Sequence, residues 1–466
     1  MSIPPFSGLS ACVQDSADAW RDNTQSPDIP AGLSEVKNKL SGMRAKLPAI
    51  YQQSFFDPLM RTLDSLTADE WAKPNWHDFL RDLVQAVIQQ AENFEPIATD
   101  AFQELISDIY DGFLSAEDRA QVKLPDFSTL PPLVRWGSPQ LGPYTYAVGD
   151  WMADLGFGAG LVSLPPANSK KGLMAWATLP HETAGHDVLG ADKGLSKELE
   201  AKVKAALLHQ GVDMAKYWAA CINEAAADVL GVLNAGPAAA IGLIAYFRGI
   251  SLSVGHGAHL DPIGEAEDTH PADLARAYLA AASLRVLHFT EKNEWARRIE
   301  AEADAEPGNM VLAGKAYTRA QVKKAVKTVV KVVLQTPMLA LENHRFDQIQ
   351  NWKNTDEEIV AAIRGHLLAG SKLAADLKPT AYATHVMAAA VMNAVFATQS
   401  PQAAFAHMLP MLKQMHDDNP SWGPIFLRHP GNLRRHYFVA ARAENHVSRG
   451  TNAAVRNKQK KQESKS

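Results

Sequence analysis

Apolar residues recur every three or four positions through most of the chain, which is the pattern of amphipathic helices packed on a core. Two such stretches, 76–94 and 98–114, precede the proline pair at 131–132. Beyond them the same pattern predicts helices over 196–209, 214–233, 238–252, 271–289, 319–341, 356–375, 379–398 and 401–416. We therefore predict a mainly α, multi-helix fold.

Residues 134–171 depart from this pattern because they are rich in glycine and aromatic residues. Within them AGLVSLPP, residues 159–166, predicts a short strand that two prolines end. We expect this small β element to lie before the most distinctive motif of the chain.

The uncharged run 229–247 approaches the length of a membrane span. It contains Asn234, Gly236 and Pro237, and proline interrupts a helix by removing a hydrogen-bond donor. We predict a buried helix pair, broken at Gly236–Pro237, and no membrane partner.

The composition narrows the class of protein without identifying it. The 466 residues carry a net charge of −5, which does not favour a nucleic-acid partner. Only Cys12 and Cys221 are present, and the first residues lack the basic and apolar segments of a secretory signal, so a cytoplasmic location is predicted. We divide the chain into an N-terminal helical region (1–130), a catalytic region (131–300), a C-terminal helical region (301–451) and a disordered basic tail (452–466).

The motif HETAGH places His181 and His186 five residues apart. In a regular α-helix these side chains would be separated by roughly 140° around the axis, too far to share a metal ion. A π-helical turn accommodates one more residue and brings them together. Pro180 and Gly185 suit a distorted turn, through a missing donor and a free backbone respectively. Glu182 would lie beside the ion without binding it.

A third ligand is expected because catalytic zinc sites commonly use three protein ligands. In CINEAAADVLG, Glu224 and Asp228 are four residues apart and therefore share one helix face. Glu224 is the predicted ligand, and Asp228 is predicted to accept the outer N–H of a ligand histidine. The alanines between them would let this helix pack close to the motif. We predict one Zn²⁺ per chain.

These two motifs resemble those of the dipeptidyl-peptidase III family of zinc metallopeptidases, H-E-x-x-G-H and E-E-x-x-A-D. The resemblance covers about fifty residues and implies His181, His186 and Glu224 as zinc ligands, Glu182 as general base and Asp228 as supporting carboxylate. Asn223 departs from the family's first glutamate. The tyrosine carboxypeptidase group, with H-E-x-x-x-H, is a related alternative.

The predicted activity is hydrolysis of peptide bonds by a zinc-activated water, with Glu182 as base. We favour His270 as the donor to the oxyanion because Pro271 would start a helix directly after it; the other candidates are His256, His259, Arg276, Tyr144 and Tyr146. A peptide could add to 159–166 as an edge strand. Alternatives are a catalytically silent zinc-binding module and a non-peptidase hydrolase or iron oxygenase.

Overall fold

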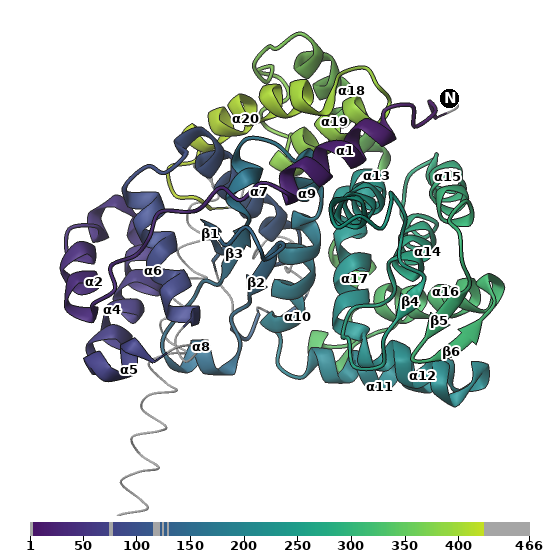
Figure 1. The fold of residues 1–466 in the computed structure, drawn as a ribbon, viewed down its shortest axis with the longest axis horizontal. Coiled ribbons are helices and arrows are strands. Elements are labelled where there is room, and N and C mark those ends of the chain that lie inside the picture. The colour runs from purple at the N-terminus through teal and green to yellow at the C-terminus, as the bar shows by residue number, and fades with distance from the viewer. Residues whose placement is uncertain (1–2, 74–77, 115–121, 124, 128–129, 424–466) are drawn as a thin grey trace, which may run out of the picture.

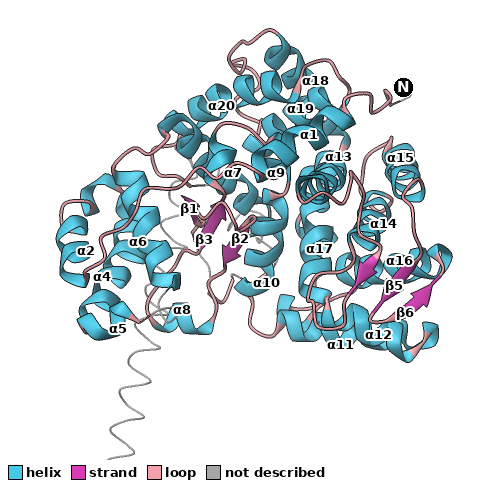
Figure 2. Cartoon of the chain, viewed as in Figure 1, coloured by secondary structure: helices cyan, strands magenta, loops and turns pink. Residues whose placement is uncertain are grey.

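The computed structural model describes residues 3–73, 78–114, 122–123, 125–127 and 130–423, and the predicted tail at 452–466 lies outside them (Figure 1). The described chain is mainly α-helical, as predicted, with two small three-stranded sheets (Figure 2). The helices before the first sheet are α1 (Leu9–Trp20), α2 (Leu33–Leu40), α3 (Ala49–Tyr51), α4 (Asp57–Asp64), α5 (Ala68–Ala72), α6 (Asp78–Ala91) and α7 (Pro96–Leu114).

The first sheet precedes the motif helix in the sequence, as predicted. It contains β1 (Leu133–Trp136), β2 (Tyr144–Tyr146) and β3 (Leu161–Leu164) in the order β1-β3-β2. The predicted strand at 159–166 is β3, which Pro165 ends, but it is the central strand, paired on both sides. The edge-strand prediction was therefore wrong for 159–166; β1 and β2 form the two edges, and β2 is antiparallel to β3.

The segment after the sheet brings the motif against a long helix. It contains α9 (Leu173–Ala177), the π-helix η4 (His181–Asp187), α10 (Val188–Ala191), α11 (Leu195–Leu207), α12 (Val212–Ala220) and α13 (Ile222–Ser253), whereas α8 (Asp150–Asp154) lies between β2 and β3. The helix predicted over 214–233 is broken at Cys221, where ψ is 11°. This break begins α13 just before Glu224 and places that residue in its first turn.

The predicted break at Gly236 is confirmed inside α13, where this residue has non-helical φ and ψ of 57° and −142°. Helix α13 is long and apolar enough to cross a membrane, but its most apolar stretch is entirely buried inside the protein. Alanine, glycine and aliphatic residues there pack against neighbouring helices. The helix is therefore a central core element.

The remaining helices complete the core on either side of α13. They are α14 (Asp273–Leu284), α15 (Lys292–Asp304), α16 (Arg319–Gln335), α17 (Phe346–Ile349), α18 (Asn354–Leu368), α19 (Ala383–Val395) and α20 (Pro401–Asp417). The helix predicted to reach 341 ends at Gln335 because Thr336, which precedes Pro337, is extended. A second sheet, β4 (Ile263–Gly264), β5 (Met310–Leu312) and β6 (Lys315–Tyr317), was not predicted.

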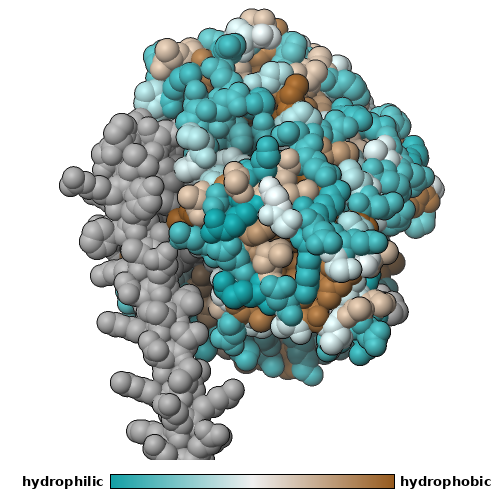
Figure 3. Space-filling view, turned by 90° about the vertical axis from the view of Figure 1, so that its left-hand side faces the viewer, coloured by the Kyte–Doolittle hydropathy of each residue, from teal (hydrophilic) through white to brown (hydrophobic). Residues whose placement is uncertain are grey.

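The described residues form two hydrophobic cores. The smaller one gathers residues from 33–88 and 130–161, and the larger one joins α1 and α7 to the chain from α9 to α20. Helix α1 lies beside α19 although they are far apart in sequence, and the amide of Gly8 donates to the carbonyl of Val395 at 2.8 Å (Figure 1). The side of the molecule that carries α2 to α5 is mainly hydrophilic, with smaller apolar areas (Figure 3).

Candidate metal centre

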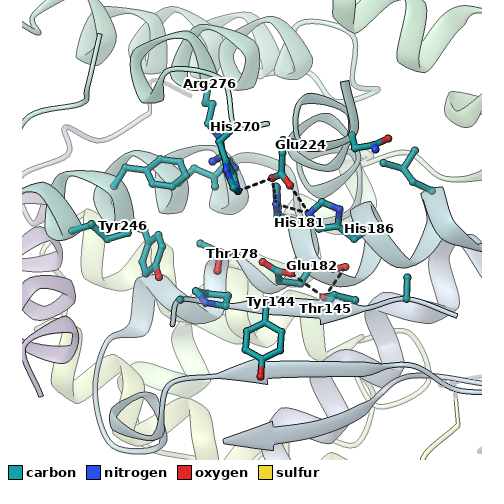
Figure 4. A pocket seen from close by; sticks show the side chains of 18 of the residues that line it. Tyr144, Thr145, Thr178, His181, Glu182, His186, Glu224, Tyr246, His270 and Arg276 are labelled. Atoms are coloured by element: carbon teal, nitrogen blue, oxygen red, sulfur yellow. Dashed lines mark hydrogen bonds and ion pairs between the residues drawn. The ribbon is translucent and has the colours of Figure 1, made fainter. Parts of the chain in front are cut away.

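The HETAGH motif forms the wide turn that its spacing predicted. Residues His181–Asp187 are a π-helix, and Nε2 of His181 lies 3.2 Å from Nε2 of His186. The two rings come from one helix and point toward the same place (Figure 4). The five-residue spacing is therefore compatible with a shared metal ion.

Gly185 has a role other than the predicted backbone freedom. Its φ is not positive; instead, a Cβ at this position would lie 2.5 Å from Cβ and 2.6 Å from Cα of Ala227 on α13. One turn further along α13, a Cβ at Gly231 would lie 3.1 Å from the backbone nitrogen of His181. Small residues on both sides thus let the backbones of η4 and α13 approach closely, as the alanine-rich second motif predicted.

This close packing brings Glu224 to the two histidines. Its Oε2 lies 3.3 Å from Nε2 of His181, and its Oε1 lies 3.4 Å from Nε2 of His186. Four ligands at 2.0–2.1 Å around tetrahedral zinc would be separated by about 3.3 Å. The three side chains therefore fit a zinc ion, and two imidazoles with one carboxylate are a donor set that zinc accepts.

Asp228 supports His181 as predicted, and Arg276 holds Asp228 in turn. Oδ1 of Asp228 lies 2.8 Å from Nδ1 of His181, which leaves Nε2 for the ion. Nε and Nη2 of Arg276 donate to the two oxygens of Asp228, each at 2.8 Å. Arg276, weighed above as an oxyanion donor, is thus buried in an ion pair.

The charges around the centre shift its acid–base equilibria. Burial alone would lower the pKa of His181, but hydrogen bonds with Asp228 and Glu224 outweigh it and raise the pKa to about 10. Burial would raise the pKa of Glu224, yet hydrogen bonds from His181 and His186 hold that pKa well below its usual value. The carboxylates therefore favour positive charge between them, which is the environment that a divalent cation requires.

Glu182 lies beside the three candidate ligands without belonging to them. It is 6% exposed, and its Oε2 accepts a hydrogen bond from Oγ1 of Thr145 at 2.9 Å. Thr145 belongs to the edge strand β2 and was not singled out from the sequence. Both side chains line a cavity of about 620 Å³ that also includes His181, His186 and Glu224 (Figure 4).

Three of the predicted oxyanion donors line the same cavity: His270, Tyr144 and Arg276, the last of which is held by Asp228. His270 is exposed; its Nδ1 contacts Asp268 at 2.8 Å, and its Nε2 lies 3.5 Å from Oε2 of Glu224. The hydroxyl of Tyr144 donates instead to Asp82 at 2.7 Å, away from the metal ligands.

The other candidates do not reach the centre. Tyr146, His256 and His259 are not among the residues that line the cavity, and Nδ1 of His259 contacts Glu306 at 3.2 Å. His270 thus remains the candidate whose ring Nε2 faces the site.

Comparisons with protein-family models, characterised proteins and solved structures give no match to this chain. The likeness to dipeptidyl-peptidase III therefore rests on the two short motifs.

Proposed function

We propose that this protein is a zinc-dependent peptidase. The observation that carries the proposal is the arrangement of three candidate ligand side chains, with contacts of 3.2–3.4 Å between their donor atoms, and a buried carboxylate, Glu182, beside them in one cavity. A site that only held zinc for stability would use a fourth protein ligand and would have no need of this carboxylate. The cavity leaves room for a substrate.

Zinc held by His181, His186 and Glu224 would polarise a substrate carbonyl and lower the pKa of water. Glu182 accepts a proton from the attacking water while the water oxygen bonds to the carbonyl carbon. When the carbon–nitrogen bond breaks, Glu182 delivers that proton to the leaving nitrogen. The hydroxyl of Thr145 fixes the Glu182 carboxylate, and Nε2–H of His270 donates to the oxygen on which negative charge develops.

Strand β2 gives the cavity a surface suited to a peptide backbone. It pairs with β3 along one side, and among the described residues no strand pairs with its other side, whose backbone groups could bind an added strand. Because Thr145 connects this strand to Glu182, a peptide bound along β2 would run past the general base. This arrangement favours a peptide substrate over a small non-peptide ester or amide.

The deciding experiment compares three zinc-loaded proteins on a library of peptides: wild type, Glu182→Gln and the control Glu200→Gln, whose side chain is exposed on α11. We expect Glu182→Gln to keep its zinc and to lose roughly 100- to 10,000-fold in turnover, the usual worth of a general base. Glu200→Gln should match the wild type. A fourth protein, Glu224→Gln, is measured for zinc binding alone and should lose zinc affinity.

Each alternative predicts a different result. A wild-type protein that binds zinc but cleaves no peptide would support the silent module, and one that binds iron from a mixture of metals would support an oxygenase. Loss of zinc from Glu182→Gln with retention by Glu224→Gln would show that the roles of the two acids are assigned wrongly.

A further inference from the structure

The cavity extends away from the metal ligands toward an apolar end. Its lining there consists of one residue from α1 and four from the second half of α13: Trp20, Leu243, Tyr246, Phe247 and Ile250. The four α13 positions follow the spacing of a single helix face. This face turns an apolar stripe toward the cavity, and Phe247, Ile250 and Trp20 are only partly buried.

Gly142 connects the apolar end of the cavity to the strand that contacts the general base. A Cβ on Gly142 would lie 3.4 Å from the hydroxyl of Tyr246 and 3.5 Å from the Trp20 ring. Gly142 precedes Thr145, the partner of Glu182, by three residues. Extended backbone spans at most about 3.3–3.6 Å per residue, so the Cα atoms of Gly142 and Thr145 lie within roughly 10 Å of each other. Figure 4 shows Tyr246 on the far side of Glu182 and Thr178 from His186.

The Tyr246 hydroxyl is a hydrogen-bond donor that the described residues leave without a partner. The side chain is 7% exposed, and its ring packs edge-on against Trp20, with the centroids 6.4 Å apart. Burial and the charge of Glu182 raise the pKa of this hydroxyl far above its usual value, so it keeps its proton. A buried donor that lines a cavity is suited to a ligand carbonyl.

The charge at this end of the cavity also restricts the ligand. The guanidinium of Arg276 lies 4.4 Å from the centroid of the Phe247 ring, but Asp228 holds it through both carboxylate oxygens. It is therefore not available to pair with an acidic side chain. Burying a charged substrate side chain against the apolar stripe would be costly, whereas an apolar one would be stabilised.

We propose that this apolar end is a substrate subsite that selects a large apolar side chain at one position within a few residues of the scissile bond. The Tyr246 hydroxyl donates to a backbone carbonyl of the same substrate segment. The proposal rests on the proposed peptidase function, and it adds a substrate class: peptides with a residue such as leucine or phenylalanine at that position.

Binding, measured separately from hydrolysis, tests the subsite. The probes are short peptide hydroxamates that differ only at the residue predicted to enter the subsite, which is Phe, Ala or Lys, titrated into zinc-loaded protein. Peptide amides of the same sequences are titrated into metal-free protein, so that the test does not depend on zinc. We expect the Phe probe to bind at least about 10-fold more tightly than the Ala probe, as apolar pockets discriminate by side-chain size, and the Lys probe to bind most weakly.

Three variants and one control separate the contributions. Trp20→Ala removes one wall, and Gly142→Val narrows the entrance at a position where a Cβ meets only ordinary contacts; both should reduce the preference for Phe over Ala. Tyr246→Phe should weaken the Phe and Ala probes equally, by about 2- to 10-fold, because it removes a backbone hydrogen bond and leaves the apolar walls. The control Trp151→Ala removes an exposed tryptophan outside the cavity and should keep the full preference.

Equal binding of the three probes to wild type would overturn the proposal, and so would an unchanged preference in both Trp20→Ala and Gly142→Val. Selective binding of the Phe probe by a protein that cleaves no peptide would refute the peptidase and retain the subsite. Cleavage of all three sequences at equal rates, with equal binding of the three probes, would support the peptidase and refute the subsite.

Discussion

Replacing Gly185 with alanine tests whether the metal centre depends on the close approach of η4 and α13. The new Cβ would lie 2.5 Å from Cβ and 2.6 Å from Cα of Ala227. Carbon atoms pack best at about 3.5–4.0 Å, so the two helices would have to separate by roughly 1 Å. Backbone atoms limit the movement on both sides, and no side-chain rotation can relieve the contact.

This displacement is large for a metal site. Overpacking a core position costs about 1–3 kcal/mol of the free energy of unfolding. Metal–ligand distances tolerate about 0.2 Å, so moving Glu224 by roughly 1 Å from His181 and His186 removes it as a ligand. We expect the zinc affinity of Gly185→Ala to fall by at least about 100-fold, the upper range for changes outside the ligands themselves.

The assay combines chelator competition, which gives the zinc Kd, with denaturant unfolding of the metal-free protein. Gly365→Ala is the matched control because a Cβ added at this exposed helical glycine would have no atom within 4 Å; its zinc affinity should not change. Adding Ala227→Gly to Gly185→Ala should restore little affinity, since the contact with Cα at 2.6 Å persists. Wild-type zinc affinity in Gly185→Ala would refute this reasoning.

Two further variants test the residues behind and in front of the ligands. Arg276→Met leaves Asp228 buried without its cation, so the free energy of unfolding, measured with denaturant, should fall by about 3–5 kcal/mol. Zinc affinity should fall by about 10- to 100-fold. Unchanged values for both would contradict the supporting role of Arg276. His270→Ala should retain zinc in metal analysis while peptide turnover falls by about 100-fold or more, the usual worth of one oxyanion donor; loss of zinc would instead identify His270 as a fourth ligand.

Local spacing explains which parts of the candidate centre the sequence predicts. The five-residue separation of His181 and His186 requires a wide turn if both bind one ion, and the structure contains that turn. The four-residue separation of Glu224 and Asp228 likewise places both on one face of α13. These relations involve neighbours in sequence, and helical geometry alone determines them.

The contributions from distant elements could not be predicted in the same way. The sequence suggests Tyr144 and Tyr146 as candidates but gives no signal for Thr145, which lies between them. Alternate residues of a strand face opposite ways, and in β2 it is Thr145 that faces Glu182. Arg276 gave no sequence signal that it would pair with Asp228. The strands of the second sheet are two or three residues long, too short for an alternating pattern to appear.

Helix α13 shows why one core element can carry both the metal ligand and the apolar wall. Its backbone approaches His181 at Gly231, and a Cβ at Gly242 would lie 2.4 Å from Cβ of Ala177. Gly231 and Gly242 are eleven residues apart, which is roughly 16 Å along a straight helix. Their contact partners, His181 and Ala177, are only four residues apart, which is roughly 6 Å at the same rise per residue. The kink inside α13 shortens the distance between these two contacts.

The break at Gly236 resolves this mismatch. Its positive φ of 57° is open to glycine, and the Trp352 ring leaves no room for a Cβ, which would lie 2.6 Å from it. The chain therefore changes direction at Gly236–Pro237, and the second half of α13 packs near the same segment, Ala177–His181, as the first half. Because of this change of direction, the apolar stripe that contains Tyr246 and Phe247 faces the cavity that contains Glu224. Gly236–Pro237, which argues against a membrane span, therefore also shapes the candidate active site.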